Sequence, residues 1–239
     1  WMDEGFTDYS STRAMAMLRN SPGFWYNGSY GGYYRLARSG YEEPASTHAD
    51  HFNTNFASTS SAYSKGAVFI LYLGYIVGAD ARDKILHAYF NTWKFKHPNP
   101  NDFIRIAEKI SGFELDWYKE YWIYSTKTID YAVGDIAMVD NKTSITIKRI
   151  GKMPMPIDVL VTYKDGTQEM HYMPLNLMYG AKPLETKTPT TVHAPWKWTH
   201  PDYSFTTSRA VGEIKSIEID PSQRLADINK TNNKLVIPE

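Results

Sequence analysis

The sequence predicts an α+β multidomain protein in which a helical part, residues 1–127, is followed by a small all-β sandwich, residues 128–239. Up to Tyr124, apolar side chains recur at the three- and four-residue spacings of helices. From Thr128 onward, short stretches of alternating polar and apolar residues lie between turn residues, which is typical of strands. About seven or eight such stretches fit into the second part, and that number suits a small sandwich.

The helical part begins with a helix that we expect to run from Glu4 to about Arg19, where Ser21-Pro22-Gly23 stops it. The stretch from Tyr26 to Tyr34 has no clear period, and we interpret it and the residues after it as a long ordered loop. Residues 62–78 are apolar almost all round, which predicts a central buried helix with Gly78 as its stop.

Three shorter helices complete this part. Asp80 is a candidate cap for a helix that carries Ile85 and Trp93. The other two are expected over 102–110, closed by Gly112, and over 115–124.

The β part contains one clear hairpin signal, because residues 158–163 and 167–172 flank Lys164-Asp165-Gly166. Further strands are expected where Ile145 and Ile147 alternate with polar residues, and over 196–207 and 213–219. The polar tail 227–233 is predicted to fray. The histidines His171, His193 and His200 are scattered along this part, so we find no convincing catalytic set in it.

Composition excludes several classes of protein. With 26 basic and 26 acidic side chains, the chain has no net field that would attract nucleic acid. No apolar run approaches the roughly eighteen residues of a membrane helix. The absence of cysteine excludes disulfides and thiolate metal sites and fits either side of a bacterial inner membrane. The compartment is therefore unknown, with a bacterial periplasmic or extracellular location favoured over the cytoplasm.

The histidine cluster of the helical part lies at His48 and His51, with Asp50 between them. On a helix, a spacing of three would place both imidazoles on one face, and Asp50 would orient one of them. A metal site needs a third ligand that the sequence does not name. The alternative is a hydrogen-bonded structural pair.

Glu4 stands in the opening turn of the first helix, where a carboxylate suits the positive end of the helix dipole. The segment around it also resembles the third-ligand motif of aminopeptidase N-like zinc metallopeptidases, the gluzincins, in which Trp, two residues and Glu-Gly-Phe present a glutamate to zinc. Here these residues are Trp1, Glu4, Gly5 and Phe6. The resemblance implies that Glu4 is a ligand of one zinc ion.

A second signature is Tyr63-Ser64-Lys65-Gly66 at the start of the central helix. It resembles the Tyr-x-Lys-Gly of the same family, in which the tyrosine hydroxyl reaches into the active site. A neutral phenol can donate one hydrogen bond to the oxyanion that forms on the scissile carbonyl. The resemblance thus gives Tyr63 a catalytic role, whereas the residue alone, one of 18 tyrosines, favours packing at a helix start.

The resemblance extends to about Tyr124, and the family carries a β-sandwich of this size after its catalytic domain. Residues 1–127 would then be the helical carboxy-terminal lobe of a thermolysin-like catalytic domain. The family's His-Glu-x-x-His motif is expected about twenty residues before Glu4, and none of the 7 histidines lies in such a motif. We therefore expect this chain to be the carboxy-terminal fragment of a zinc metalloaminopeptidase, inactive alone, whose partners are its missing amino-terminal portion and a peptide substrate. The alternative is a non-catalytic structural or protein-interaction fragment of a degenerate peptidase.

Overall fold

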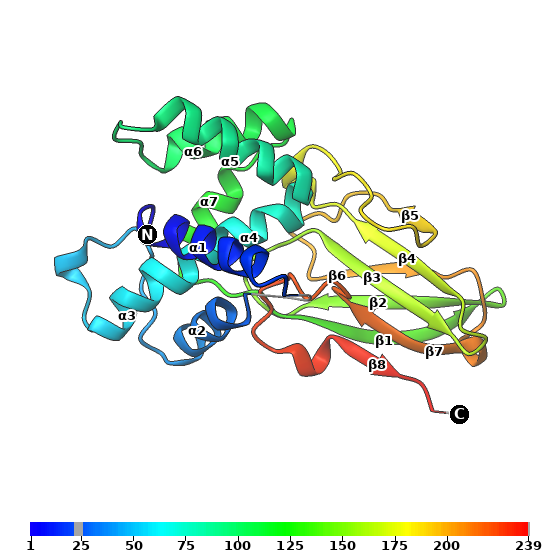
Figure 1. Ribbon diagram of the computed structural model, residues 1–239. Coiled ribbons are helices and arrows are strands. Elements are labelled where there is room, and N and C mark those ends of the chain that lie inside the picture. The colour runs from blue at the N-terminus through cyan, green and yellow to red at the C-terminus, as the bar shows by residue number, and fades with distance from the viewer. Residues whose placement is uncertain (22–25, 239) are drawn as a thin grey trace. The chain divides into compact units, whose positions relative to one another are not determined.

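The computed structural model describes residues 1–21 and 26–238 of the chain. They form two compact units, Trp1–Lys127 and Thr128–Glu239. The first unit is helical and the second consists of strands, as Figure 1 shows, so the predicted α+β class is confirmed. None of the helices in the described ranges is both long and apolar enough to cross a membrane.

The helical unit contains seven α-helices, one 3-10 turn and one π-turn within its described residues. In chain order these are α1 (Glu4–Leu18), α2 (Asn27–Arg38), η1 (Ala49–His51), α3 (Asn55–Ser60), the π-turn η2 (Ser61–Lys65), α4 (Gly66–Val77), α5 (Ala79–Trp93), α6 (Pro100–Ser111) and α7 (Asp116–Ile123). Helices α3 and α4 are joined directly through η2, so they form one helix with a wide turn in its middle.

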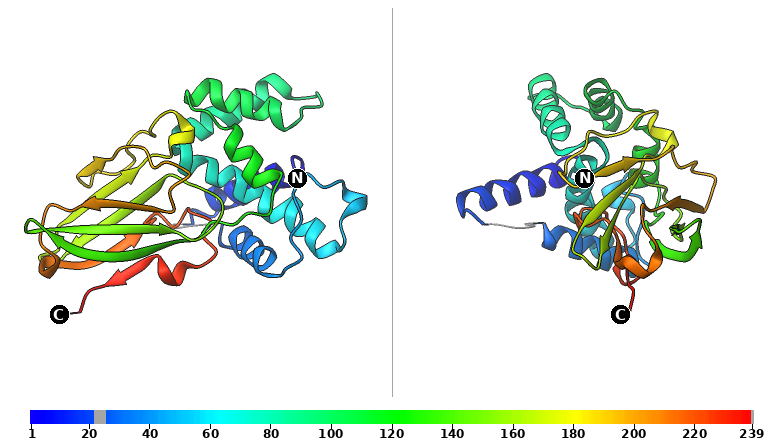
Figure 2. Two further views of the ribbon diagram at one scale, coloured as in Figure 1. Left: turned by 180° about the vertical axis from the view of Figure 1, so that it is seen from behind. Right: turned by 90° about the vertical axis from the view of Figure 1, so that its right-hand side faces the viewer.

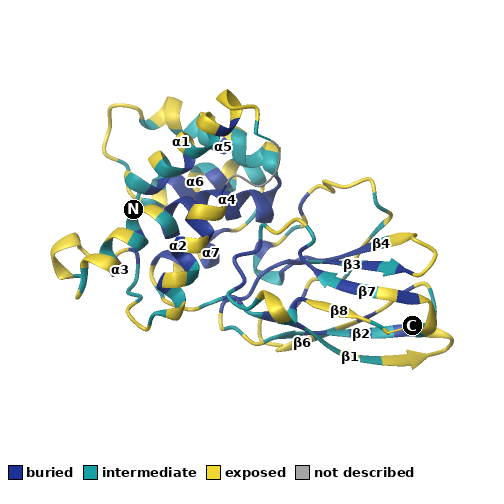
Figure 3. Ribbon diagram, turned by 60° about the horizontal axis from the view of Figure 1, so that its bottom comes forward, coloured by how far each residue is buried: buried dark blue, intermediate teal, exposed yellow. Residues whose placement is uncertain are grey.

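Helix α4 is the centre of this unit, because every one of its residues is buried (Figure 3). The ring of Phe69 stacks on that of Tyr118 with centroids 4.7 Å apart, and the Tyr118 hydroxyl donates a 2.7 Å hydrogen bond to the Phe69 carbonyl. Gly78 ends the helix at φ 93°, a left-handed conformation that favours glycine. The predicted central helix and its stop are therefore confirmed.

The loop predicted over Tyr26 to Tyr34 is wrong, because these residues open α2. Three glycines weaken the helical signal there, yet Tyr30, Tyr33 and Leu36 repeat at a spacing of three and lie buried on one face. Burial of that face outweighs the low helix propensity of glycine.

The neighbouring helices follow their local signals in most details. In α6, Asn99 and Asp102 form a capping box, and Gly112 ends the helix at φ 74° as predicted. Asp80 does not cap α5, which begins one residue earlier at Ala79. The predicted end of α1 near Arg19 is confirmed, whereas the stop at Pro22 and Gly23 lies outside the described residues.

Within its described residues, the β unit contains eight strands in two sheets. Figure 2 shows the ribbon from two further sides. One sheet has the order β1-β2-β6 and the other β5-β4-β3-β7-β8. The strands are β1 (Tyr131–Val139), β2 (Lys142–Arg149), β3 (Ile157–Tyr163), β4 (Gln168–Met173), β5 (Thr190–Val192), β6 (Asp202–Thr206), β7 (Ile214–Ile219) and β8 (Lys234–Val236).

Alternating burial along the strands builds the core of this unit. In β3 the side chains of Ile157, Val159 and Val161 are buried, and the residues between them are partly exposed. Strands β3 and β4 form the predicted hairpin, with Gly166 at φ 85° in its turn. A side chain from each sheet meets in the core, where the ring centroids of His171 and Phe205 lie 4.3 Å apart.

Two predictions for this unit are wrong. The strand expected over 196–207 is only β6, Asp202–Thr206. The tail 227–233 is not frayed, because Asp227 is buried and its carboxylate accepts hydrogen bonds from the Tyr131 amide at 2.8 Å and from Asn233 at 2.9 Å.

Candidate active site

The structure brings the two motif residues Glu4 and Tyr63 together. Glu4 lies in the first turn of α1, and Tyr63 is the middle residue of the π-turn η2. Hydrogen bonding to the Glu4 carboxylate is the main cause that raises the pKa of the Tyr63 phenol above its usual value. Tyr63 is 42% exposed and Glu4 is half-buried, so both side chains are open to a molecule from outside.

Two glycines set the spacing between these side chains. A Cβ built on Gly5 would lie 2.6 Å from the Gly66 Cα, and one built on Gly66 would lie 2.8 Å from the Gly5 Cα. Carbon atoms in contact normally stay about 3.5–4.0 Å apart, so helices α1 and α4 cross with their backbones touching. The residue after Glu4 and the residue that begins α4 must therefore both lack a side chain.

Aromatic rings fix the start of α1 on the rest of the unit. The Trp1 ring packs edge-on against Phe69 of α4, with centroids 5.1 Å apart, and Phe6 packs edge-on against Phe103 of α6 at the same separation. Such contacts stabilise a pair by about 0.5–1.5 kcal/mol beyond the burial of its area. The other motif residues, Trp1 and Phe6, thus hold Glu4 in place through packing.

The predicted histidine cluster lies in the 3-10 turn η1 and at its start. The ring centroids of His48 and His51 are 5.3 Å apart and both side chains are exposed. The Nδ1 atom of His48 accepts a 3.2 Å hydrogen bond from the Asp50 amide, so this imidazole caps the turn. Within the described ranges, neither histidine belongs to a group of three possible metal ligands.

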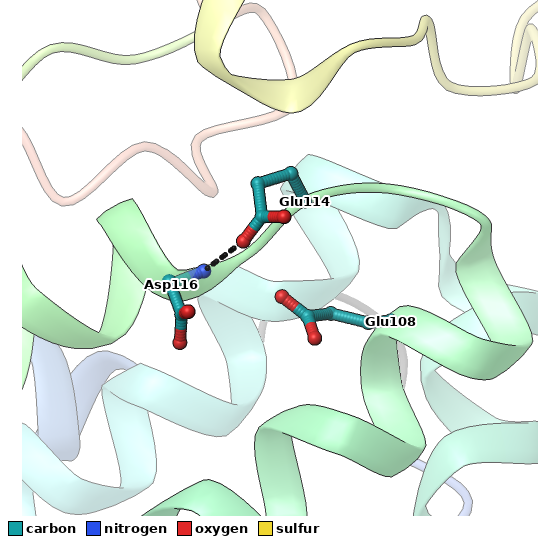
Figure 4. A group of neighbouring side chains, drawn as sticks. All are labelled: Glu108, Glu114 and Asp116. Carbon is teal, nitrogen blue, oxygen red and sulfur yellow. Dashed lines mark hydrogen bonds between the residues drawn. The ribbon is translucent and has the colours of Figure 1, made fainter.

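Among the described residues, one acidic cluster has three possible metal ligands close together, and Glu4 is not one of them. The carboxylates of Glu108, Glu114 and Asp116 lie within 4.8 Å of one another and point toward a common space (Figure 4). Each already accepts a hydrogen bond: Glu108 from the Leu115 amide at 2.9 Å, Glu114 from the Asp116 amide at 3.2 Å, and Asp116 from Lys119 at 2.8 Å. The Glu108 bond joins the end of α6 to the start of α7, and the other two lie at the start of α7, so the cluster has a structural explanation.

The residues present therefore fit zinc only in part. A catalytic zinc ion needs three protein ligands and an open position, and the described part of the chain offers Glu4 without two partners close enough to share an ion. Its carboxylate is half-buried and has the Tyr63 phenol beside it, which suits one ligand of such an ion.

The β unit contains a polar network that the sequence analysis missed. The His171 Nε2 lies 3.1 Å from Glu169 Oε1, and the His171 Nδ1 lies 2.9 Å from the His193 Nε2. With the carboxylate accepting from Nε2, the Nδ1 atom of His171 accepts from His193. Burial is the main cause that lowers the pKa of both imidazoles. Strands β4 and β5 pair in parallel and align His171 with Thr191, which no local pattern indicates.

No protein family and no curated protein matches the sequence of this chain. The fold, however, is similar to part of a solved structure, that of aminopeptidase A from Legionella pneumophila in complex with aspartic acid. The TM-score is 0.56 at 15% sequence identity, and the similarity covers 94% of this chain and 23% of that chain. At this identity the similarity concerns the fold alone. The chain spans about a quarter of the length of that structure.

Proposed function

We propose that this chain is the carboxy-terminal part of the catalytic domain of a zinc-dependent aminopeptidase together with the β unit that follows. The complete protein would hydrolyse amino-terminal residues from peptides. The observation that carries this proposal is the Glu4 carboxylate beside the Tyr63 phenol, held there by the backbone contact of Gly5 with Gly66. The aminopeptidase fold of the structural neighbour supports it.

In this proposal Glu4 is one ligand of a single zinc ion, and the other two ligands come from a preceding part of the protein. Bound zinc polarises a carbonyl and lowers the pKa of its water. The contribution of Tyr63 is a hydrogen bond from its phenol to the oxygen that becomes negative on the scissile carbonyl. A phenol has an ordinary pKa of about 10 and is neutral at working pH, so the Tyr63 hydroxyl has a proton to donate.

The test uses the complete protein and two substitutions. Tyr63→Phe removes the donor and leaves the ring, so we expect bound zinc to stay and kcat to fall by about a hundredfold or more. Glu4→Ala removes a ligand, so zinc content measured by metal analysis should fall. Normal turnover in Tyr63→Phe would contradict the role of the phenol, and full zinc occupancy in Glu4→Ala would contradict that of the carboxylate.

A non-catalytic role in protein contact is the second candidate. The observation that favours it is an apolar groove of about 500 Å³ between α1 and α5, which includes Phe6, Leu86 and Phe90. Exposed apolar surface of this kind occurs at protein interfaces. Zinc analysis and an aminopeptidase assay of the complete protein decide between the two candidates, because a contact module would bind no zinc and release no amino acid.

A further inference from the structure

Tyr63 stands in an energetically unusual piece of helix. The π-turn η2 places five residues, Ser61–Lys65, between the regular helices α3 and α4. A π-turn contains one residue more than an α-helical turn. Such turns are rare in proteins and occur often at functional sites. Contacts with the surrounding structure must therefore hold the wide turn against the regular helix.

One of these contacts is a buried ion pair. The Lys65 ammonium donates a 2.7 Å hydrogen bond to Glu42 Oε1 and a 3.2 Å bond to the Ser125 carbonyl. The side chains of Lys65 and Glu42 are only 3% and 7% exposed. Burial of this kind lowers the pKa of Lys65, and the Glu42 carboxylate acts against that shift.

Such a pair adds little to stability compared with apolar side chains of the same size, because both charges must leave water. What it does provide is a fixed position for each partner, since a charge displaced from its partner inside the protein is costly. Lys65 directly follows Ser64 and is two residues from Tyr63, so fixing its ammonium fixes the end of the turn.

The backbone and side chains next to Tyr63 are held as well. The Trp122 indole donates a 3.1 Å hydrogen bond to the Lys65 carbonyl. Ser64 fills the space at Gly32 of α2, where an added Cβ would lie 2.1 Å from the Ser64 Oγ. With Gly66 against Gly5, each of the three residues after Tyr63 contacts a segment outside the turn.

We propose that Lys65 and Glu42 are positioning residues that hold the π-turn and thereby keep the Tyr63 phenol beside Glu4. The catalytic consequence of this placement rests on the function proposed above, whereas the placement itself does not. Lys65 and Glu42 touch neither the substrate nor the metal in this proposal, and they act through the backbone of the turn.

The experiment compares Lys65→Met with the wild-type chain by NMR, with ¹³C-labelled tyrosine rings and the Tyr63 signal assigned from its loss in Tyr63→Phe. We expect the nuclear Overhauser contact between the Tyr63 ring and the Glu4 side chain to disappear. The matched control is Lys119→Met, which removes the buried Lys119 ammonium of α7 from Asp116 and Asn101, neither of which belongs to the turn. In that variant the contact should persist.

A folded Lys65→Met chain with an unchanged Tyr63 signal and contact would overturn the positioning role. If Lys65→Met does not fold, the double variant Lys65→Met/Glu42→Gln replaces both buried charges with neutral groups, a change that proteins commonly tolerate. The same NMR contact then decides, because a neutral pair no longer anchors the turn.

Kinetics of the complete protein separate this proposal from the proposed function. We expect kcat of Lys65→Met to fall toward that of Tyr63→Phe while KM changes little. If the NMR contact is lost and kcat is unchanged, the role of Tyr63 in catalysis is wrong and the positioning role stands. If the contact is retained, the positioning role is wrong whatever the value of kcat.

Discussion

The backbone contact between α1 and α4 makes Gly5→Ala an informative substitution. The new methyl carbon would lie 2.6 Å from both the Cα and the carbonyl carbon of Gly66 and 3.1 Å from its oxygen. These are backbone atoms, so no side chain can rotate away. Restoring a carbon contact of about 3.5 Å requires α1 to move by about 1 Å.

The expected cost follows from two opposing effects. Overpacking of a well-filled interior typically costs about 1–3 kcal/mol, and contact with two backbone atoms places this site near the upper end. Alanine is favoured over glycine within a helix by about 1 kcal/mol, which offsets part of that cost. We therefore expect Gly5→Ala to lower the free energy of unfolding by about 2 kcal/mol.

Gly31→Ala is the matched control. Gly31 is exposed within α2, and an added Cβ would meet nothing within 4 Å. Only the helix propensity acts there, so this variant should be stabilised by about 0.5–1 kcal/mol. Urea denaturation followed by circular dichroism at 222 nm, where helices dominate the signal, measures both changes. A Gly5→Ala protein as stable as Gly31→Ala would refute the close-contact reasoning.

Two further predictions concern the pH dependence of the β unit, measured as urea midpoints followed by tryptophan fluorescence. The pKa values of His171 and His193 are lowered in the folded state. Their contribution to the free energy of unfolding is therefore fully present above the ordinary histidine pKa of about 6.5 and is lost as the pH falls below it. In His193→Gln the amide can still donate a hydrogen bond to His171 but carries no charge, so this variant should lose less stability than the wild type between pH 7 and 5. A pH dependence of the urea midpoint equal to that of the wild type would show that the pair does not titrate as described. Burial raises the pKa of Asp227 from its ordinary value of 3.8 to about 6. The contribution of this carboxyl to the free energy of unfolding is therefore fully present below pH 3.8 and is lost as the pH rises through 6. The free energy of unfolding of Asp227→Asn should therefore rise relative to that of the wild type by up to about 3 kcal/mol between pH 4 and 6.5. If the difference in unfolding free energy between the two proteins is constant over this range, the raised pKa is contradicted.

Elements with local signals could be predicted from the sequence. Helix α6 has Pro100 in its first turn, a capping box and a closing Gly112, and the β3–β4 hairpin has Asp165-Gly166 at its turn. These capping and turn residues act on neighbours only a few residues away in the chain, so the sequence alone is sufficient to predict their effect.

Elements that depend on distant residues could not be predicted. Helix α2 exists because Tyr33 and Leu36 are buried by other helices, not because its glycines favour it. The tail is ordered by Asp227, whose partner Tyr131 lies 96 residues away along the chain. The π-turn gives no signal either, since the residues Ser61–Lys65 would also suit a regular helix.

The candidate site also contains some residues that the sequence predicts and others that depend on distant contacts. Glu4 and Tyr63 were selected by their motifs, and the structure places them side by side. The reason for their proximity, a crossing of two glycine backbones, involves Gly5 and Gly66 from separate helices and was not apparent from either motif alone. Lys65 was noted only as a member of the Tyr-x-Lys-Gly motif and Glu42 was not noted at all, because a buried ion pair between residues 23 apart leaves no local pattern.

The π-turn also makes this helix sensitive to chain length. A π-turn contains one residue more than an α-helical turn, so deleting one residue from Ser61–Lys65 would leave a regular helix in which α3 and α4 keep nearly the same orientation. A different side chain would then occupy the position of Tyr63 while α4 kept its buried contacts. A single-residue deletion can therefore exchange the residue beside Glu4 without altering the core, and an alignment of related chains without a gap here would pair the wrong residues.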